Sequence, residues 1–322
     1  MRVLIVKVSS LGDIIHTLPA VTDAKKAHPN VVFDWVVEEN FIEVPSWHPA
    51  INKVIPVALR RWRLNLLKTY LNREFLSFKK TLQNVHYDLV IDAQGLIKSG
   101  IISRLSRGLT VGLSNRTIRE PLASLFYNKA YSVSWEKHAV DRIRQLFSRA
   151  LNYEYDNYPL DYGIKFEKNN ANDTGTKKND IVFLHGTTRV NKYWPKEKWR
   201  DLAKLATDYG CYVVLPWGTS EEKKRAEFIG EKNLKVKILG KKSLSDLAIA
   251  INKSKGVVAV DTGLGHLSAA LSKSTVSLYG PTNPALCGTY GTNQIHLKLE
   301  EEPIDVWNNF QKLTNSFKNP DA

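Results

Sequence analysis

The chain has 322 residues, of which 43% are hydrophobic and 24% charged, proportions that exclude a disordered or fibrous protein and are typical of a globular one. Its 46 basic residues outnumber its 32 acidic residues, and the net charge of +14 favours an anionic partner: nucleic acid, an acidic membrane or a phosphorylated substrate. Since no apolar run reaches the roughly 18 residues of a membrane span and the N-terminus lacks a secretion signal, we expect a cytoplasmic protein.

The first half of the chain alternates strand and helix patterns. Short apolar runs predict strands, and apolar residues spaced three or four apart predict helices between them. Such alternation is typical of a parallel sheet covered on both faces. The predicted strands are 2–8, 31–37, 53–57, 87–92, 109–113 and 130–133, and the predicted helices are 13–27, 64–84, 96–106, 119–128 and 136–150.

A polar stretch at 163–180 predicts a linker, after which the alternation resumes. The predicted strands are 181–184, 211–216, 235–239, 256–260 and 275–279, and the predicted helices are 195–209, 220–231, 243–252, 263–272 and 304–317. The fold class is therefore α/β, with two Rossmann-like doubly wound domains at 1–162 and 181–303 and a final helix and tail at 304–322. Ligands of such sheets bind beyond the carboxyl ends of the strands, so we expect the site in a cleft between the domains.

The turn Asp261-Thr262-Gly263 joins a buried strand to a helix. A helix N-terminus attracts phosphate, and glycines at 263 and 265 let a ligand approach the backbone. Asp261, Thr262 and His266 can add hydrogen bonds. A dinucleotide fingerprint is incomplete here, since its third glycine and its acidic ribose partner are missing. As alternatives, Asp261 only caps the helix and His266 is a structural histidine.

Two more loops of this domain follow strand ends. Thr187, Thr188 and Lys192 suit phosphate oxygens, unless the lysine is merely solvated. Glu221 or Glu222 could hold ribose hydroxyls, unless both only complement the helix dipole.

In the first domain, Gly12 predicts a tight turn, and Asp13 follows it at a strand's carboxyl end. Asp13 could take a proton from an attacking hydroxyl, or could only cap its helix. Metal binding has no sequence support, since the chain lacks paired cysteines and the usual histidine and aspartate motifs.

Two arginine clusters follow other strand ends of the first domain. Guanidinium groups grip phosphate and carboxylate in a bidentate manner, although such clusters can also be solvated basic faces. The clusters are Arg60, Arg61 and Arg63, and Arg116 with Arg119.

These stretches resemble the bacterial lipopolysaccharide heptosyltransferases of glycosyltransferase family 9. The resemblance is carried by Ser9-Ser10-Leu11-Gly12-Asp13 with His16-Thr17-Leu18-Pro19, by Asp92-Ala93-Gln94-Gly95-Leu96 and by Asp261-Thr262-Gly263-Leu264-Gly265-His266. Arg60-Arg61-Trp62-Arg63, the stretch 119–128 and Pro216-Trp217-Gly218 are similar to the heptosyltransferase I branch.

The resemblance implies the glycosyltransferase B fold and a metal-independent, inverting transfer of L-glycero-D-manno-heptose from ADP-L-glycero-β-D-manno-heptose (ADP-heptose) to the first Kdo of Kdo2-lipid A, without a cofactor. It also implies peripheral contact with the cytoplasmic face of the inner membrane, and we expect a monomer. Asp13 would be the catalytic base and Lys192 would assist the departing diphosphate. The implied donor-binding residues are Thr187, Thr188, Lys192, Glu222, Asp261, Thr262, Gly263 and His266, and the implied acceptor-binding residues are Ser10, Gly12, Arg60, Arg61, Arg63, Gln94 and Arg119.

Three alternatives stay open: a heptosyltransferase acting on a later core sugar, a nucleotide-sugar epimerase of similar fold, and a basic nucleic-acid-binding protein. No nucleic-acid-binding module is recognisable, so we expect no nucleic-acid partner. Lys241-Lys242 departs from the family pattern, which has an apolar residue in the adenine pocket.

Overall fold

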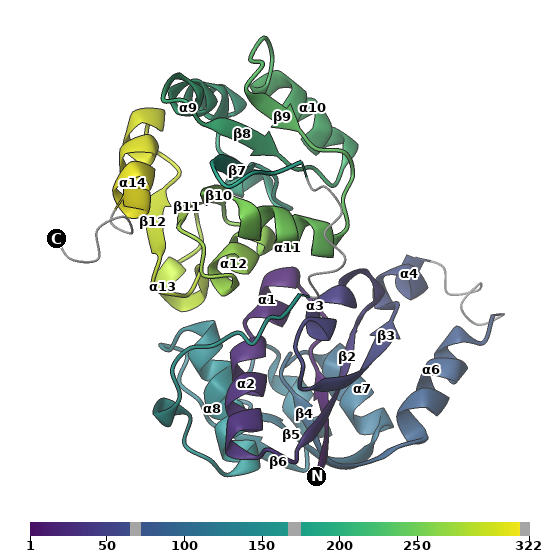
Figure 1. Ribbon diagram of the computed structural model, residues 1–322. Helices are drawn as coiled ribbons and strands as arrows, with labels where there is room; N and C mark the ends of the chain where they lie inside the picture. The colour runs from purple at the N-terminus through teal and green to yellow at the C-terminus, as the bar shows by residue number, and fades with distance from the viewer. Residues whose placement is uncertain (65–71, 167–174, 316–322) are drawn as a thin grey trace. The chain divides into compact units, whose positions relative to one another are not determined.

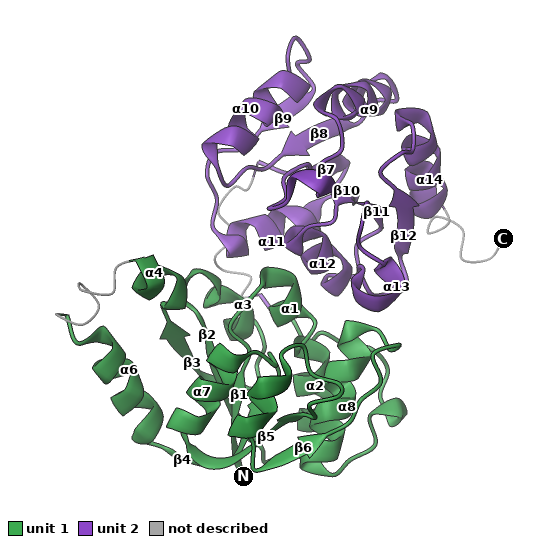
Figure 2. Ribbon diagram, turned by 180° about the vertical axis from the view of Figure 1, so that it is seen from behind, with its two compact units in different colours: residues 1–165 green, residues 166–322 purple. Residues whose placement is uncertain are grey.

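The structure is a computed structural model that describes residues 1–64, 72–166 and 175–315. It divides into two compact units, Met1–Lys165 and Phe166–Ala322 (Figures 1 and 2). Parts of three predicted segments lie outside the described residues: 65–71 of the helix at 64–84, 167–174 of the linker, and 316–322 of the final helix and tail.

Unit 1 is built on a six-stranded parallel sheet with the order β3-β2-β1-β4-β5-β6. Residues 3–6 of the central strand are fully buried, as expected when helices cover both faces of a parallel sheet. The six predicted strands of this unit are confirmed as β1 (Arg2–Val6), β2 (Val32–Glu38), β3 (Ile51–Val57), β4 (His86–Asp92), β5 (Arg107–Leu113) and β6 (Lys129–Tyr131).

Helices cover both faces of this sheet (Figure 1). They are α1 (Leu11–Ile15), α2 (Leu18–Ala27), α3 (Glu43–Ser46), α4 (Leu59–Leu64), α6 (Glu74–Gln83), α7 (Ile97–Leu105) and α8 (Ala139–Leu151), with the 3-10 turns η1 (Glu39–Phe41), η2 (Pro121–Phe126) and η3 (Tyr155–Asn157). Phe78 of α6 and Ile102 of α7 share one buried cluster with Val6 of β1. Elsewhere α2 packs on α8, and the Phe147 ring of α8 lies 6.5 Å from that of Phe33 on β2.

Two predicted helices of unit 1 differ in the structure. The helix predicted at 13–27 divides into α1 and α2 because Pro19, in the first turn of α2, has no N–H to continue the helical hydrogen bonding. The stretch 119–128 forms the 3-10 turn η2, which begins at Pro121.

Unit 2 repeats the architecture with the order β12-β11-β10-β7-β8-β9, again all parallel. Its strands are β7 (Asp180–Leu184), β8 (Tyr212–Leu215), β9 (Val236–Ile238), β10 (Gly256–Val260), β11 (Thr275–Tyr279) and β12 (Gln294–Lys298). The first five confirm predictions. The prediction missed β12, an edge strand in which Ile295 and Leu297 are the only large apolar residues.

The helices of unit 2 are α9 (Lys196–Asp208), α10 (Ser220–Ile229), α11 (Leu244–Lys253), α12 (Gly263–Ala270), α13 (Pro284–Cys287) and α14 (Pro303–Asn315), with the 3-10 turn η5 (Val190–Lys192). Helix α14 belongs to the core of this unit, where Trp307 and Phe310 share a buried cluster with Trp199 of α9. Within the described residues, none of the helices combines the length and apolarity needed to cross a membrane.

The two sheets have the same strand order when unit 2 is numbered from β7. In this order successive strands are added toward one edge of the sheet up to the third strand and toward the other edge from the fourth strand on. The switch lies between β1 and β4 in unit 1 and between β7 and β10 in unit 2. Ligands of doubly wound sheets bind at this switch point, beyond the carboxyl ends of the strands. We therefore expect the functional residues in four loops, one after each of these strands.

Candidate active site

The loops after β7 and β10 meet at the switch point of unit 2. The Thr187 hydroxyl donates a hydrogen bond to the backbone carbonyl of Asp261 at 3.0 Å. The Lys192 Nζ lies 2.5 Å from Oδ2 of Asp261, and the two side chains are 17% and 8% exposed. Three of the predicted donor-binding residues thus come together just before α12.

Helix α12 begins at Gly263, and its N-cap residue is Thr262 rather than Asp261. The Thr262 hydroxyl makes no capping hydrogen bond, so the first amide groups of α12 are not capped by that side chain. Gly265 is a buried residue of α12, and an added Cβ there would lie 3.5 Å from Cβ of Ala259 on β10, so ligand approach at this glycine stays a prediction. His266 is also largely buried in α12.

Of the two candidate glutamates, Glu222 faces the loop after β7. Its Oε2 accepts hydrogen bonds from the backbone N–H groups of Gly218 at 2.6 Å and Thr219 at 3.2 Å. Its Oε1 lies against Gly186, where an added Cβ would be only 2.4 Å away. Glu221 is exposed instead. The geometry therefore favours Glu222 over Glu221 for ribose.

The other residues expected near the donor are more accessible. Thr188 and Lys241 are exposed and Lys242 is half-buried. Both lysines precede α11, in the connection from β9, so they belong to a loop rather than to the switch point.

Asp13 lies in the first turn of α1, at the switch point of unit 1. Its Oδ2 accepts hydrogen bonds from both the backbone N–H and the hydroxyl of Ser10, each at 2.8 Å, and its Oδ1 lies 3.9 Å from Nζ of Lys7. The side chain is 39% exposed, so Asp13 caps its helix and is also accessible to an acceptor. The tight turn predicted at Gly12 is wrong, since Gly12 is a buried residue of α1.

Gln94 joins the two loops at this switch point. Its side-chain oxygen accepts hydrogen bonds from the backbone N–H groups of Val8 and Ser9, both at 3.0 Å. Since that oxygen is already used, Gln94 would meet an acceptor through its amide NH2 group.

A buried carboxylate that the sequence analysis did not assign, Asp92, organises the loop after β4. It accepts hydrogen bonds from the backbone of Gln94 and Gly95 and from the hydroxyls of Ser99 and Tyr127, at 2.7 to 3.0 Å. Burial raises the pKa of Asp92, and burial together with Asp92 raises the pKa of Tyr127. Asp92 thus fixes the loop that carries Gln94.

Arg61 is engaged by two carboxylates of its own unit. Its guanidinium contacts Glu39 at 3.1 Å and Glu74 at 2.8 Å, and the Trp62 indole also donates to Glu74 at 2.7 Å. These contacts lower the pKa of Glu74 to about 2. Arg61 therefore has a structural role in addition to any role toward an acceptor.

The other predicted arginines have different surroundings. Arg60 lies over the Phe41 ring, 5.5 Å from its centroid, and Arg63 and Arg119 are exposed. In the described part of the chain, no carboxylate forms an ion pair with Arg60, Arg63 or Arg119. Burial lowers the pKa of Lys7, and the positive charge of Arg119 is a smaller cause in the same direction.

Two Rossmann-ordered sheets, one with an accessible carboxylate and the other with a lysine and a helix N-terminus at the switch point, fit a two-domain glycosyltransferase. The family model of glycosyltransferase family 9 (heptosyltransferase) matches residues 75–313, and the chain belongs to that family. The predicted fold class and family are confirmed. Among the described residues, no group of three histidine, cysteine or acidic side chains could hold a metal.

Within the family, the chain is similar to named heptosyltransferases and to their solved structures. The chain is 51% identical to lipopolysaccharide heptosyltransferase 1 of Pseudomonas aeruginosa over 92% of this chain and 83% of that protein. The structure of E. coli heptosyltransferase WaaC with ADP has a TM-score of 0.91 at 44% identity, covering 97% of this chain and all of the other. The same enzyme with ADP-2-deoxy-2-fluoro heptose has a TM-score of 0.89 at 44% identity, covering 97% and 99%.

Proposed function

We propose that this cytoplasmic enzyme, acting as a monomer, transfers heptose from ADP-heptose to the first Kdo of Kdo2-lipid A during synthesis of the lipopolysaccharide inner core. The observation that carries the proposal is that the two switch points hold different chemical groups. Unit 1 has a hydrogen-bonded, accessible carboxylate at Asp13, and unit 2 has the cluster of Thr187, Lys192 and Asp261 before α12. The relatives named lipopolysaccharide heptosyltransferase 1, and the ADP and fluorinated ADP-heptose bound to WaaC, support the acceptor and the donor.

Unit 2 is proposed to bind the donor. The ammonium group of Lys192 and the N-terminal amides of α12 stabilise negative charge on a diphosphate, so the leaving group departs without a metal. Asp261 holds Lys192 at 2.5 Å and thereby sets its position. Glu222 faces the ribose hydroxyls, and Thr188, Thr262, Gly263 and His266 complete the predicted donor site.

Unit 1 supplies the base. Asp13 takes the proton from a Kdo hydroxyl while the hydroxyl oxygen forms a bond to the anomeric carbon and the bond from that carbon to the diphosphate breaks. The transition state has oxocarbenium character, and attack opposite to the leaving ADP inverts the anomeric centre. Ser10 holds one oxygen of Asp13, and the side chain is 39% exposed, so the carboxylate has a fixed orientation and stays accessible to the acceptor.

The acceptor carries phosphates and carboxylates, which suit guanidinium groups. We assign these contacts first to Arg60, Arg63 and Arg119, for which no ion pair exists in the described part of the chain. Arg61 contributes by fixing the loop region through Glu39 and Glu74. Ser10, Gly12 and Gln94 line the same switch point and remain predicted acceptor-binding residues.

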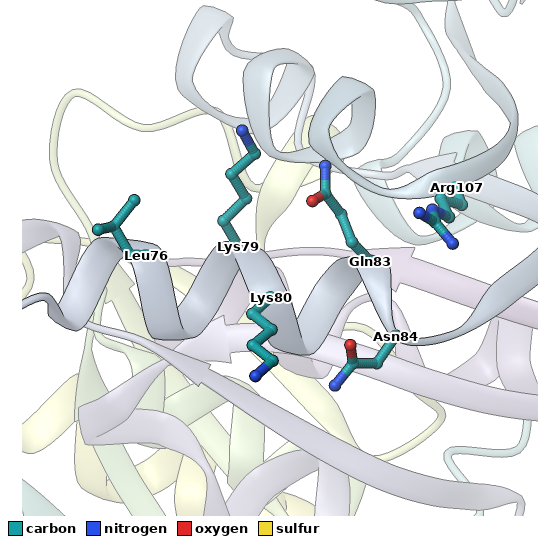
Figure 3. A pocket seen from close by; sticks show the side chains of 6 residues that line it. All are labelled: Leu76, Lys79, Lys80, Gln83, Asn84 and Arg107. Atoms are coloured by element: carbon teal, nitrogen blue, oxygen red, sulfur yellow. The ribbon is translucent and has the colours of Figure 1, made fainter.

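Contact with the inner membrane is supported by the outer side of α6, α7 and η2, which pack side by side. Leu76 is 57% exposed, Ile101 43% and Leu125 78%. Basic residues lie beside Leu76. Figure 3 shows the surface pocket that Leu76, Lys79, Lys80, Gln83 and Asn84 line with Arg107 of β5. Apolar side chains mixed with cations suit an anionic lipid surface. We call this surface the α6–α7–η2 face.

The test of the activity is ADP release from the purified protein given ADP-heptose with and without Kdo2-lipid A. The proposal is supported if ADP release requires the acceptor and the lipid product carries one added heptose. Turnover of the donor without acceptor would indicate an epimerase or hydrolase, and activity confined to acceptors that already carry heptose would indicate a later core transferase. Asp13→Asn is expected to reduce kcat by roughly 10²- to 10⁴-fold while ADP still binds.

Membrane contact is tested by co-sedimentation with vesicles of neutral lipid or of neutral plus anionic lipid. Leu125→Ser with Lys79→Glu should weaken binding to anionic vesicles, because the pair removes one apolar and one basic contact. Lys204→Glu on α9, an exposed lysine outside the α6–α7–η2 face, is the matched control. Equal binding of both variants would exclude this face.

A further inference from the structure

We propose that Lys7 is a positioning residue for the catalytic base, whose buried ammonium group keeps the Asp13 carboxylate ionised and holds its orientation. The inference deepens the proposed function and rests on it, since Asp13 acts as a base only if the chain transfers a glycosyl group.

Lys7 is buried at the switch point of unit 1. It follows β1 directly, and only 5% of its surface is exposed. Its Nζ donates a hydrogen bond to the backbone carbonyl of Ala93 at 2.8 Å, which holds the ammonium group between the loops after β1 and β4. A lysine is rarely buried to this extent without a charged partner. The partners here are carboxylates.

Two carboxylates and two guanidinium groups act on this ammonium group. Asp13 of α1 lies 3.9 Å away. Burial lowers the pKa of Lys7 below its usual value, while the charges of Asp13 and Asp92 act in the opposite direction. Arg119 and Arg142 also lower it. Asp92 already has four hydrogen-bond donors of its own, whereas Asp13 lies within ion-pair distance of Lys7, so Asp13 is the carboxylate on which we infer that Lys7 acts.

The ammonium group of Lys7 beside Asp13 favours the protonation state that a catalytic base needs. A carboxylate must be ionised before it can accept a proton, and an opposite charge within about 4–6 Å favours the ionised form. Ser10 fixes Oδ2 of Asp13, whereas Lys7 faces Oδ1. Together the two residues hold the carboxylate plane and leave it partly exposed to the acceptor.

The experiment measures the ionisation of Asp13 directly in the full-length protein. The protein is labelled with ¹³C at the aspartate carboxyl carbons, the Asp13 signal is assigned by its loss in Asp13→Asn, and its titration is compared between wild type, Lys7→Met and Lys7→Gln. Lys7→Gln keeps a donor for Ala93 but removes the charge, so it separates electrostatics from packing. We expect the Asp13 pKa to rise by about 1–2 units in both variants.

A matched control is available in the same unit. Lys25 also donates from Nζ to a backbone carbonyl, that of Val31 at 2.9 Å, but has no carboxylate within ion-pair distance in the described part of the chain. Lys25→Gln should leave the Asp13 titration unchanged. The acidic limb of kcat against pH should move with the NMR titration in the Lys7 variants, which a purely structural role would not produce.

Two histidine rings lie in the same unit, so the experiment follows the Asp13 carboxyl signal itself rather than the activity alone. His16 on α1 and His138 lie 5.5 Å apart between ring centroids. If the Asp13 pKa stays within about 0.3 units of wild type in both Lys7 variants, the proposal is overturned. If wild type releases no ADP with ADP-heptose and Kdo2-lipid A, the proposed function fails, while the titration still decides whether Lys7 acts on Asp13.

Discussion

Removing the charge of Lys192 should impair the enzyme in two ways: the diphosphate loses a cation, and it is repelled by the unpaired Asp261 carboxylate. A second substitution, at Asp261, should reverse the repulsion. Lys192→Met loses an ammonium group, and it also leaves the Asp261 carboxylate, 8% exposed and now unpaired, beside the proposed diphosphate. A charged hydrogen bond contributes about 1.5–3 kcal/mol. The repulsion between the Asp261 carboxylate and the diphosphate adds to this loss.

The repulsion is estimated from the position of the lysine. With Nζ 2.5 Å from Oδ2 of Asp261 and a phosphate oxygen about 2.8 Å beyond it, the two negative charges lie about 5 Å apart. At an effective dielectric constant of about 20, unit charges at that separation repel by about 3 kcal/mol. Since solvent reaches the pair, we expect a combined loss of about 3–5 kcal/mol, or about 10²- to 10⁴-fold in kcat/KM for ADP-heptose.

The double variant Lys192→Met with Asp261→Asn removes the repulsion but not the lost cation. Its kcat/KM should therefore exceed that of Lys192→Met alone by about tenfold or more. Steady-state ADP release with saturating acceptor measures kcat/KM, and calorimetry with ADP measures binding. A double variant no better than the single one would refute the assignment of the diphosphate next to this ion pair.

Two further predictions follow from contacts at the edges of the site. Gly186→Ala would place a methyl group where Oε1 of Glu222 now lies, so the carboxylate must move away from the loop after β7. If that carboxylate holds the ribose, losing one charged hydrogen bond of about 1.5–3 kcal/mol should weaken ADP binding by about 10- to 150-fold, and calorimetry that finds unchanged affinity would remove Glu222 from the donor site. Arg61 and Trp62 lower the Glu74 pKa to about 2, so the stability that Glu74 contributes is complete above about pH 5 and is lost as the pH falls toward 2. The difference in Tm between wild type and Glu74→Gln should therefore shrink from pH 5 to pH 3. A constant difference would contradict the pairing.

Local patterns in the sequence identified most of the architecture. Strand and helix periodicity depends on neighbouring residues, so eleven of the strands were predictable from short windows. The strand β12 was missed because its two apolar residues give too weak an alternation, and it forms where β11 offers an open edge for pairing. The division of 13–27 into α1 and α2 had a local signal in Pro19 that the prediction did not use.

The sequence by itself determined the doubly wound class and the residues with chemistry at the strand ends, because these depend on spacing and composition, and its motifs carried the resemblance to the family. Only the tertiary structure decided which of them meet. Thr187 and Lys192 reach Asp261 across some 70 residues because β7 and β10 are neighbours in the sheet. The engagement of Arg61 by Glu39 and Glu74, and the burial of Lys7 beside Asp13, likewise result from strand order and packing, which no local window contains.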